Sequence, residues 1–271
     1  MTTETTQPIH LAIHGAAGRM GRRLIALTPE FDALRLVAAI ERPGHELIDA
    51  SIAAAIDPDA DAAVVISDHV PEGVDVLIDF TAPAAMRRAL DGCARAGAAM
   101  VIGTTGLSDD DHQTIDDAAA LIPVLQAPNM SLGVNLLFAL AGRVAKQLGD
   151  DYDIEIVEAH HRFKKDAPSG TALGLARSIC DATGKDMQTD VVHGRVGDEV
   201  PRQRGRIGMH ALRMGDVVGE HTVSFGTLGE RLELRHVATS RDIFARGALR
   251  AAGWLANQPT GRYTMADVLG L

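Results

Sequence analysis

The chain has little cysteine, few aromatic residues and no long apolar segment. Two of its 271 residues are cysteines, Cys93 and Cys180, which lie far apart and outside any CxxC spacing. This argues against a disulfide framework and a zinc site, and we expect two small buried thiols in a reducing compartment and no metal ion. No apolar run reaches the ~18 residues that a membrane span needs. The sequence therefore predicts a cytoplasmic protein without a membrane partner.

Positive charge is in deficit. Lysine and arginine number 26 against 36 aspartate and glutamate residues, which gives a formal net charge of -10. This acidic balance argues against nucleic acid as a partner. The polar first eight residues lack the apolar segment of a signal peptide, and we interpret them as a loose tail. The remaining composition, 46% hydrophobic and 23% charged, is that of a globular protein, and the length favours two domains over one.

A glycine-rich turn lies between a predicted strand and a predicted helix near the start of the chain. Residues 9–14 form the strand pattern, Gly-Ala-Ala-Gly-Arg-Met-Gly follows, and residues 22–27 continue as a helix. A dinucleotide-binding fingerprint needs this context, although the spacing here is GxxGxxG rather than GxGxxG. Glycines also end strands for structural reasons alone. The residues that we assign to the cofactor are Gly15, Ala16, Ala17, Gly18, Arg19 and Met20.

A second predicted strand, residues 34–40, ends in Glu41 and Arg42. An acidic residue about 20 positions after the last glycine is placed to bind a ribose hydroxyl. The neighbouring guanidinium is suited to a 2′-phosphate. The pair therefore predicts that both NADH and NADPH are accepted. The alternative is a strand end that carries two solvated charges.

Further predicted strands alternate with helices up to residue 126. Residues 75–80, 98–102 and 122–126 have strand character, and helices are expected from about 84 to 95 and from 108 onward. Because ligands of a parallel doubly wound sheet lie at the carboxyl ends of its strands, the segments after these strands should line the nicotinamide end. Besides Phe80 and Thr81, they contain Gly103, Thr104, Thr105, Ala127, Pro128, Asn129 and Met130.

The pattern changes after residue 131. An apolar helix is predicted over 132–145, and strands over 152–157, 207–213, 217–225 and 230–237, with hairpin connections at 214–216 and 226–229. Residues 183–206 are predicted to be an irregular loop. The strands alternate apolar and polar residues, as in an antiparallel sheet with one wet face. No element in the sequence is evident to cover the apolar face, which favours a homo-oligomer.

These patterns define an α/β protein of two domains. We predict an N-terminal Rossmann-type doubly wound parallel sheet over residues 1–130, with a final helix and the rest of residues 241–271 packing back on it. Residues 131–240 are predicted to form a C-terminal α+β domain on a mainly antiparallel sheet, which binds substrate and mediates oligomerisation.

The segment from Glu158 to Ala172 carries the strongest chemical signal. It joins the strand at 152–157 to a helix-like run at 172–179, and it places two imidazoles, two ammonium groups and a guanidinium within six residues. Its Pro-Ser-Gly-Thr sequence opens the helix and supplies amides and hydroxyls that suit a carboxylate or phosphate. A solvated basic loop is the alternative. Proton donors beside an anion-binding turn predict acid–base chemistry on an anionic substrate.

Four segments together resemble the 4-hydroxy-tetrahydrodipicolinate reductase family, formerly dihydrodipicolinate reductase. They are the glycine turn, the Gly-Thr-Thr-Gly turn at 103–106, residues 129–135 and the Glu158–Ala172 segment, and the resemblance runs from about residue 9 to 269. It implies a small dicarboxylate substrate in the diaminopimelate route to lysine, reduction by NADPH or NADH, and a homotetramer. By resemblance, His160 is the proton donor/acceptor and Lys164 a proton donor. The positions that would contact substrate carboxylates are His161, Gly170 and Thr171, and the residues themselves add Ser169.

Phe163 and Pro128 depart from the family pattern, in which position 163 carries a third imidazole in some members. Two other functions stay open on the sequence. One is a different two-domain oxidoreductase acting on a small anionic amino acid or sugar. The other is a non-catalytic nucleotide sensor, which the joint presence of His160 and Lys164 disfavours because a sensor needs no proton donor.

Overall fold

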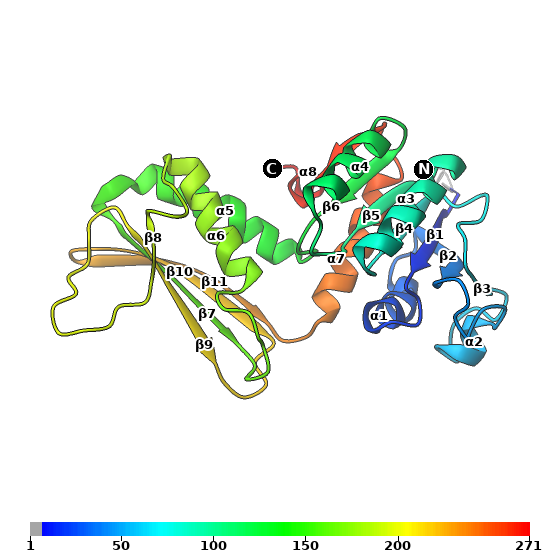
Figure 1. Cartoon of the computed structure of the whole chain (residues 1–271), viewed down its shortest axis with the longest axis horizontal. Helices are drawn as coiled ribbons and strands as arrows, with labels where there is room; N and C mark the ends of the chain where they lie inside the picture. The colour runs from blue at the N-terminus through cyan, green and yellow to red at the C-terminus, as the bar shows by residue number, and fades with distance from the viewer. Residues whose placement is uncertain (1–6) are drawn as a thin grey trace, which may run out of the picture. The chain divides into compact units, whose positions relative to one another are not determined.

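The computed structural model describes residues 7–271, which form two compact units (Figure 1). The first unit contains the described residues up to Ser131 together with Asp242–Gly270, and the second contains Leu132–Arg241. Of the polar tail predicted for residues 1–8, positions 1–6 lie outside the described residues. No helix among residues 7–271 is long and apolar enough to cross a membrane.

A parallel sheet of seven strands forms the centre of the first unit. Its spatial order is β12-β6-β5-β4-β1-β2-β3, and all its strand pairs are parallel. The strands are β1 (Ile9–His14), β2 (Leu34–Ile40), β3 (Ile66–Ser67), β4 (Val76–Asp79), β5 (Ala99–Ile102), β6 (Pro123–Gln126) and β12 (Gly261–Tyr263). The doubly wound parallel sheet is thus confirmed.

The sequence missed both edge strands of this sheet. We predicted residues 122–126 as its last strand, but β12 pairs with β6 beyond it, and β3 extends the other edge. Both strands are very short, so neither offers the alternation over four or more residues by which a strand is recognised. Strand β12 follows α7 (Asp242–Leu255), and β3 follows the segment after β2, so the pairing of each edge strand depends on the path of the segment before it.

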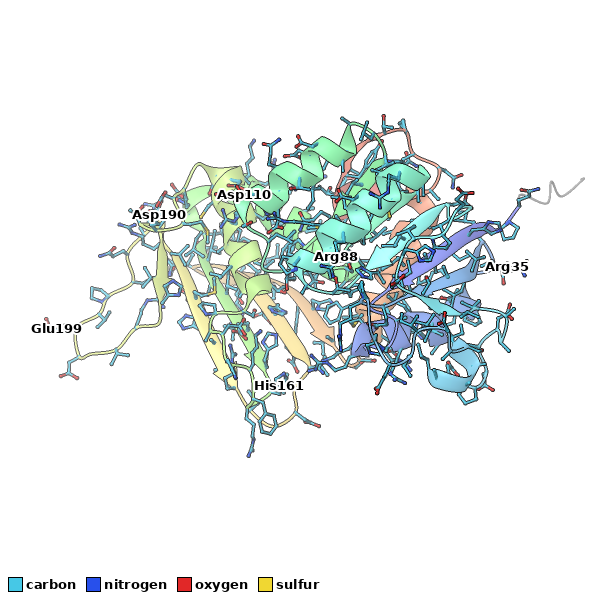
Figure 2. All side chains as sticks on the ribbon, turned by 45° about the vertical axis from the view of Figure 1, so that its right-hand side comes forward. Arg35, Arg88, Asp110, His161, Asp190 and Glu199 are labelled. Carbon is cyan, nitrogen blue, oxygen red and sulfur yellow. The ribbon has the colours of Figure 1, made fainter. Side chains whose placement is uncertain are left out.

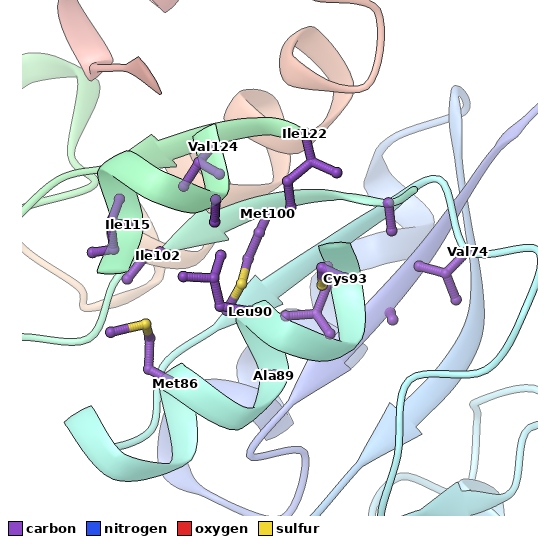
Figure 3. Packing of buried hydrophobic residues seen from close by; sticks show 14 of the residues in the cluster. Val74, Met86, Ala89, Leu90, Cys93, Met100, Ile102, Ile115, Ile122 and Val124 are labelled. Carbon is purple, nitrogen blue, oxygen red and sulfur yellow. The ribbon is translucent and has the colours of Figure 1, made fainter. Parts of the chain in front are cut away.

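Helices cover both faces of the sheet. The helices of this unit are α1 (Arg19–Leu27), α2 (Ile52–Ala55), α3 (Pro83–Ala96), α4 (Asp109–Ala119), α7 and α8 (Met265–Leu269), with a 3-10 turn at Thr28–Glu30, and α1, α3, α4 and α7 contact the strands. On one face, α3 and α4 pack against β5 and β6 through side chains that include Met86, Leu90, Met100, Ile115 and Val124 (Figure 3). Alternate strand residues face the other side, where α1 and α7 pack.

Local chemistry explains where these helices begin. Helix α4 starts after Ser108, whose side chain accepts from the Asp111 amide while the Asp111 carboxylate accepts from the Ser108 amide, a reciprocal capping box. Helix α1 starts at Arg19, earlier than the predicted residue 22; its N-cap Gly18 makes no side-chain cap, but its carbonyl oxygen accepts from the Arg22 amide at 3.0 Å. The predicted buried, unpaired thiols are confirmed, since Cys93 and Cys180 are both free and buried.

The second unit contains a five-stranded mixed sheet and two helices. Strand order is β11-β10-β7-β9-β8, with antiparallel pairing from β11 to β7 and parallel pairing from β7 to β8. The elements are α5 (Leu132–Leu148), a 3-10 turn (Gly149–Asp151), β7 (Asp153–His160), α6 (Gly170–Thr183), β8 (Val191–His193), β9 (Ile207–Arg213), β10 (Gly219–Thr227) and β11 (Glu230–Ala238). The predicted fold class is confirmed, and the second sheet, predicted to be mainly antiparallel, is mixed, with two antiparallel and two parallel strand pairs.

One predicted hairpin is wrong. Residues 214–216 do not join neighbouring strands, because β7 lies between β9 and β10. Strand β9 pairs in parallel with β7, and the chain reaches β9 from β7 through α6 and β8. Apolar–polar alternation shows which face a residue occupies but not which strand lies beside it. The segment predicted to be an irregular loop, 183–206, likewise contains β8, a strand of only three residues.

The apolar face of the second sheet is covered within the unit. Residues of α5 and α6, such as Leu137, Ala141, Leu175 and Ile179, form one core cluster with the strand residues below them, among them Phe225. Our sequence argument for an oligomer, which rested on an uncovered apolar face, was therefore wrong. The pattern did not show that α5 and α6 would pack on the same sheet, because the two helices are separated along the chain by β7.

Candidate active site

The glycine turn lies at the carboxyl end of β1. The amides of Gly15 and Ala16 both donate to the carbonyl oxygen of Ile40 on β2, at 2.8 and 3.2 Å, and Gly15 has a φ of +76°. A Cβ on Gly21 would lie 2.2 Å from the carbonyl oxygen of Gly15, so only glycine lets α1 approach the turn this closely. No acidic residue occupies the first turn of α1, which leaves the positive end of its dipole available to an anion.

Glu41 reaches back over the glycine turn. Its Oε1 accepts a hydrogen bond from the Ala17 amide at 2.9 Å, and its Oε2 accepts from the Arg42 amide at 3.3 Å. The acidic residue predicted to bind ribose therefore also braces the turn. Glu41 and Arg42 line a cavity of about 510 Å³ together with His14, Arg88 and Arg95. Figure 2 labels Arg88, which lies on α3.

A buried carboxylate organises the next strand ends. Asp79, at the end of β4, has no exposed surface. Its Oδ1 lies 2.8 Å from His14 Nδ1 and accepts from the Thr81 hydroxyl at 2.7 Å, and its Oδ2 accepts from the Thr104 hydroxyl at 2.5 Å. The predicted cofactor residue Thr104 thus turns its side chain inward. The side chains of Ala127 and Met130 are buried too, so these three positions can offer a ligand only their backbone.

The remaining predicted positions are at the same edge of the sheet. The strand ends of β1, β2, β4, β5 and β6 point the same way because every pair is parallel, which places the segments after them along one edge. Thr105 and Pro128 are exposed, and Asn129 Oδ1 accepts from the Ser131 amide at 2.8 Å. A glycine turn at a helix N-terminus, a carboxylate beside it and arginines in the adjoining cavity fit a dinucleotide.

The second unit holds a buried carboxylate at one end of its sheet. Glu158, on β7, has no exposed surface. Its carboxylate accepts hydrogen bonds from both terminal nitrogens of Arg213, on β9, at 2.8 Å each. Its Oε2 also lies 2.6 Å from His160 Nδ1, and its Oε1 accepts from the Ser169 amide at 3.0 Å. Burial opposes the charge, but the hydrogen bonds from Arg213, His160 and the Ser169 amide outweigh it and hold the pKa of Glu158 below its ordinary value.

His160 lies at the end of β7, with its ring against that of His221 on β10. The ring centroids are 5.2 Å apart with the planes at 73°. Burial lowers the pKa of His160, and Lys164 and Arg213 act in the same direction, while Glu158 partly opposes them. Burial, together with the nearby His160, lowers the pKa of His221 to about 4, so this ring is neutral at neutral pH.

Helix α6 begins beside these imidazoles. The Ser169 side chain accepts from the Ala172 amide at 3.2 Å as an N-cap, and its Oγ lies 3.1 Å from His221 Nε2. Gly170 and Thr171 are the first two helical residues, no acidic residue lies in the first turn, and first-turn amides lack intrahelical acceptors. The structure thus brings His160 and the predicted anion-binding turn together.

The loop after His160 carries the other predicted residues. Lys164 Nζ donates to Asp166 Oδ1 at 2.9 Å. His161 follows β7 directly (Figure 2), and its ring centroid is 6.2 Å from that of Phe163, whose side chain is 78% exposed. The Nδ1 atom of His161 is buried without a hydrogen-bond partner in this structure.

Three residues of this cluster were not predicted as site residues. Glu158 comes from β7, whereas Arg213 and His221 come from the consecutive strands β9 and β10, far from β7 in the sequence. Only Glu158 lies in the Glu158–Ala172 segment. A charged residue on the apolar face of the predicted strand 207–213 was the available signal for Arg213, and Glu158 directly follows the predicted strand 152–157 in phase with Ile154 and Ile156. In the first unit, His14 and Asp79 were also missed, although each is a polar residue within a predicted apolar strand. No group of three or more His, Cys, Asp or Glu side chains within residues 7–271 is arranged to hold a metal ion.

The fold and site define a two-domain oxidoreductase that uses a pyridine nucleotide. Residues 9–130 match the family model described as Dihydrodipicolinate reductase, N-terminus, and residues 133–269 match Dihydrodipicolinate reductase, C-terminus. The chain belongs to the dihydrodipicolinate reductase family.

Individual relatives agree over almost the whole chain. A 4-hydroxy-tetrahydrodipicolinate reductase from an Anaeromyxobacter species is 50% identical over 266 residues, which cover 97% of this chain and 98% of the relative. The enzyme of that name from Alkalilimnicola ehrlichii is 48% identical, with 96% and 98% covered. A solved structure, dipicolinate-bound dihydrodipicolinate reductase from Paenisporosarcina sp. TG-14, has a TM-score of 0.77 at 23% identity and covers 96% of this chain and 99% of its own.

Proposed function

We propose that this chain catalyses the NAD(P)H-dependent reduction of 4-hydroxy-tetrahydrodipicolinate to tetrahydrodipicolinate in the diaminopimelate route to lysine. The observation that carries the proposal is the cluster in which a buried carboxylate holds His160 beside the N-terminus of α6. Near-full-length relatives at about 50% identity carry the name of that reductase, which supports the same substrate.

The substrate is a cyclic dicarboxylate imine that loses its 4-hydroxyl together with a hydrogen of ring C3 as water, which leaves a conjugated double bond between C3 and C4. When bound, the reduced nicotinamide supplies a hydride for ring C4, and the protein must deliver a proton to C3. His160 is the proposed donor, because an imidazole titrates near neutral pH. Lys164 is proposed as a second proton donor. Its ammonium group also suits a substrate carboxylate, because its present partner is the Asp166 carboxylate.

The substrate carboxylates are proposed to bind at the start of α6. Ser169, Gly170 and Thr171 present a hydroxyl-rich first turn, and the helix dipole favours an anion there. His161 lies one residue beyond His160 and is proposed to contact a carboxylate as well. The first unit would then bind the dinucleotide and the second would bind the substrate.

NADPH and NADH are both proposed to act as the hydride donor. Glu41 and Arg42 line the same cavity, so a free ribose hydroxyl finds an acceptor and a 2′-phosphate finds a guanidinium. The backbone around Gly15–Met20 is proposed to hold the pyrophosphate, and the segments 103–105 and 127–130 to approach the nicotinamide. A biosynthetic reductase of this kind is proposed to work in the cytoplasm, where the dinucleotide pool is reduced.

We also propose a homotetramer. The face of the second sheet opposite α5 and α6 exposes Leu212 and Val237, which share one row through the strand register. Exposed apolar side chains on a broad sheet face support self-association. Light scattering should then give four times the monomer mass of 28.7 kDa. A monomer mass at micromolar concentration would contradict the tetramer and leave the proposed reaction untouched.

A turnover assay tests the proposed function. Purified protein is mixed with freshly generated synthase product, and oxidation of NADPH or NADH is followed. His160→Gln should lower turnover ~10²-fold or more, as expected for the loss of a positioned proton donor, while the Michaelis constant changes less. No turnover by the wild-type protein would favour a nucleotide sensor, and turnover of only another amino acid or sugar would favour a different oxidoreductase.

A further inference from the structure

Glu158 has no solvent exposure, and the hydrogen-bond donors around it are divided between its two carboxylate oxygens. Oε2 accepts a hydrogen bond from one terminal nitrogen of Arg213 at 2.8 Å and lies 2.6 Å from His160 Nδ1. Oε1 accepts from the other terminal nitrogen of Arg213 at 2.8 Å and from the Ser169 amide at 3.0 Å. An ionised carboxylate only accepts hydrogen bonds, so the His160 nitrogen that faces it must carry a hydrogen. The neutral imidazole is therefore the Nδ1–H tautomer, and its free lone pair is on Nε2.

A second neighbour, Gly219, shows where Nε2 lies. A Cβ built on Gly219 of β10 would lie 3.1 Å from His160 Nε2, so this nitrogen faces the backbone of a residue without a side chain. When His160 binds a proton, the proton goes to Nε2, because Nδ1 is already occupied by the hydrogen that faces Glu158. Glu158 thereby decides which nitrogen exchanges the catalytic proton.

We propose that Glu158 is a positioning residue that selects the proton-transferring nitrogen of His160 and, through the Ser169 amide, ties that imidazole to the start of α6. This inference rests on the proposed function, in which His160 is the proton donor and α6 binds a substrate carboxylate. Arg213 holds the carboxylate in one orientation with its two terminal nitrogens, which bind carboxylate oxygens as a fork. Arg213 also donates to the carbonyl oxygen of Asp166 at 2.7 Å, which fixes the loop between His160 and α6.

The charges around His160 give this arrangement a measurable pH effect. Burial, Lys164 of the following loop and Arg213 of β9 lower the pKa of His160, and Glu158 of its own strand raises it. His221 of β10, whose own pKa is lowered to about 4, is neutral at neutral pH and adds no charge there. The Asp166 carboxylate is paired with Lys164. Loss of the Glu158 charge should therefore lower the pKa of His160 further.

The primary test is the tautomer of His160 in the unmodified protein. Full-length protein labelled with ¹⁵N-histidine is studied by solid-state NMR between pH 5 and 9, and the His160 signals are identified by their loss in His160→Gln. We expect a neutral ring that carries its hydrogen on Nδ1. A neutral ring with its hydrogen on Nε2 would overturn the inference, and this readout needs neither turnover nor any variant at position 158.

Glu158→Gln tests the consequence for catalysis. In this variant one of the two carboxylate oxygens becomes an NH2 group, which cannot accept a hydrogen bond, so either the His160 Nδ1–H or the Ser169 amide loses its acceptor. We expect kcat to fall about 10- to 100-fold, the effect typical of removing a hydrogen-bond partner that orients a functional histidine. Because the acid must be protonated, a lower His160 pKa should move the alkaline decline of kcat to lower pH. Glu158→Asp, which keeps the charge, should restore part of kcat.

Glu155→Gln is the matched control. Glu155 lies on the same strand and the opposite face, and it also lies 2.7 Å from an imidazole nitrogen, that of His210, and accepts from Arg195 and Arg202. Its replacement should lower the unfolding free energy without moving the pH profile or the His160 signals. An unchanged pH profile and His160 pKa in folded Glu158→Gln would overturn the inference. Absence of turnover in the wild-type protein would instead contradict the proposed function, since the NMR result stands apart from it.

Discussion

The hydroxyl of Thr171 is expected to contribute to the binding of a substrate carboxylate. Thr171 is the second residue of α6, two positions after the N-cap Ser169, where a substrate carboxylate is proposed to bind. Thr171→Val keeps the shape and removes a donor. We expect the Michaelis constant to rise by the equivalent of ~1–3 kcal/mol of lost binding, with kcat changed less. Steady-state kinetics would measure this, and an unchanged constant would reduce the Ser169–Thr171 segment to a helix cap.

Arg42 is expected to discriminate between the two dinucleotides. Its guanidinium lines the cavity beside Glu41, and only NADPH carries a 2′-phosphate for it to bind. Arg42→Ala should weaken NADPH much more than NADH, and added salt should weaken NADPH binding more steeply in the wild-type protein. Glu41→Ala should shift the preference toward NADPH. If Arg42→Ala weakens the binding of both dinucleotides equally, another residue contacts the 2′ position. Arg19 in the glycine turn is then the next residue to replace.

At the scale of elements, the approach of α1 to the glycine turn depends on Gly21. Its missing side chain leaves room for the Gly15 carbonyl oxygen, which a Cβ would meet at 2.2 Å. Gly21→Ala should force α1 away from β1, lower the unfolding free energy by ~1–3 kcal/mol and weaken NADPH and NADH alike. Urea unfolding and dinucleotide titration measure both effects.

Gly253 supplies the control for that substitution. It lies inside α7, and a Cβ there would meet Leu34 at 3.8 Å, an ordinary contact. Gly253→Ala should be neutral or stabilise the protein by up to ~1 kcal/mol, because alanine favours the helix. Equal destabilisation by both substitutions would mean that added volume in any helix, rather than the packing of α1 on the turn, is responsible.

At the scale of the whole molecule, each unit has its own core, so the two ligands should protect different amides. NADPH should slow hydrogen exchange in β1 and the glycine turn of the first unit. Dipicolinate, the dicarboxylate named with the Paenisporosarcina structure, should slow exchange at the first amides of α6 in the second unit. Mass spectrometry of peptides from the exchanged full-length protein would show this. If NADPH alone slowed exchange at the first amides of α6, the start of this helix would bind the dinucleotide instead of the substrate.

Local patterns predicted most of the elements of both units. Strands β1, β2 and β9 have the predicted bounds, and α4 begins directly after Ser108, where a helix was expected. These features depend on residues a few positions apart, so periodicity and capping chemistry reveal them. The edge strands β3 and β12 escaped because two or three residues carry no period.

The sequence by itself determined the chemistry available along the chain: a glycine turn between strand and helix, an acid and a base after β2, and two imidazoles before a helix N-terminus. Tertiary structure decided which distant groups act on them. Arg213 reaches Glu158 only because β9 pairs in parallel with β7, and His221 meets Ser169 only because β10 lies on the other side of β7. Strand neighbours are chosen by long-range packing of side chains from the whole unit, which no local period encodes.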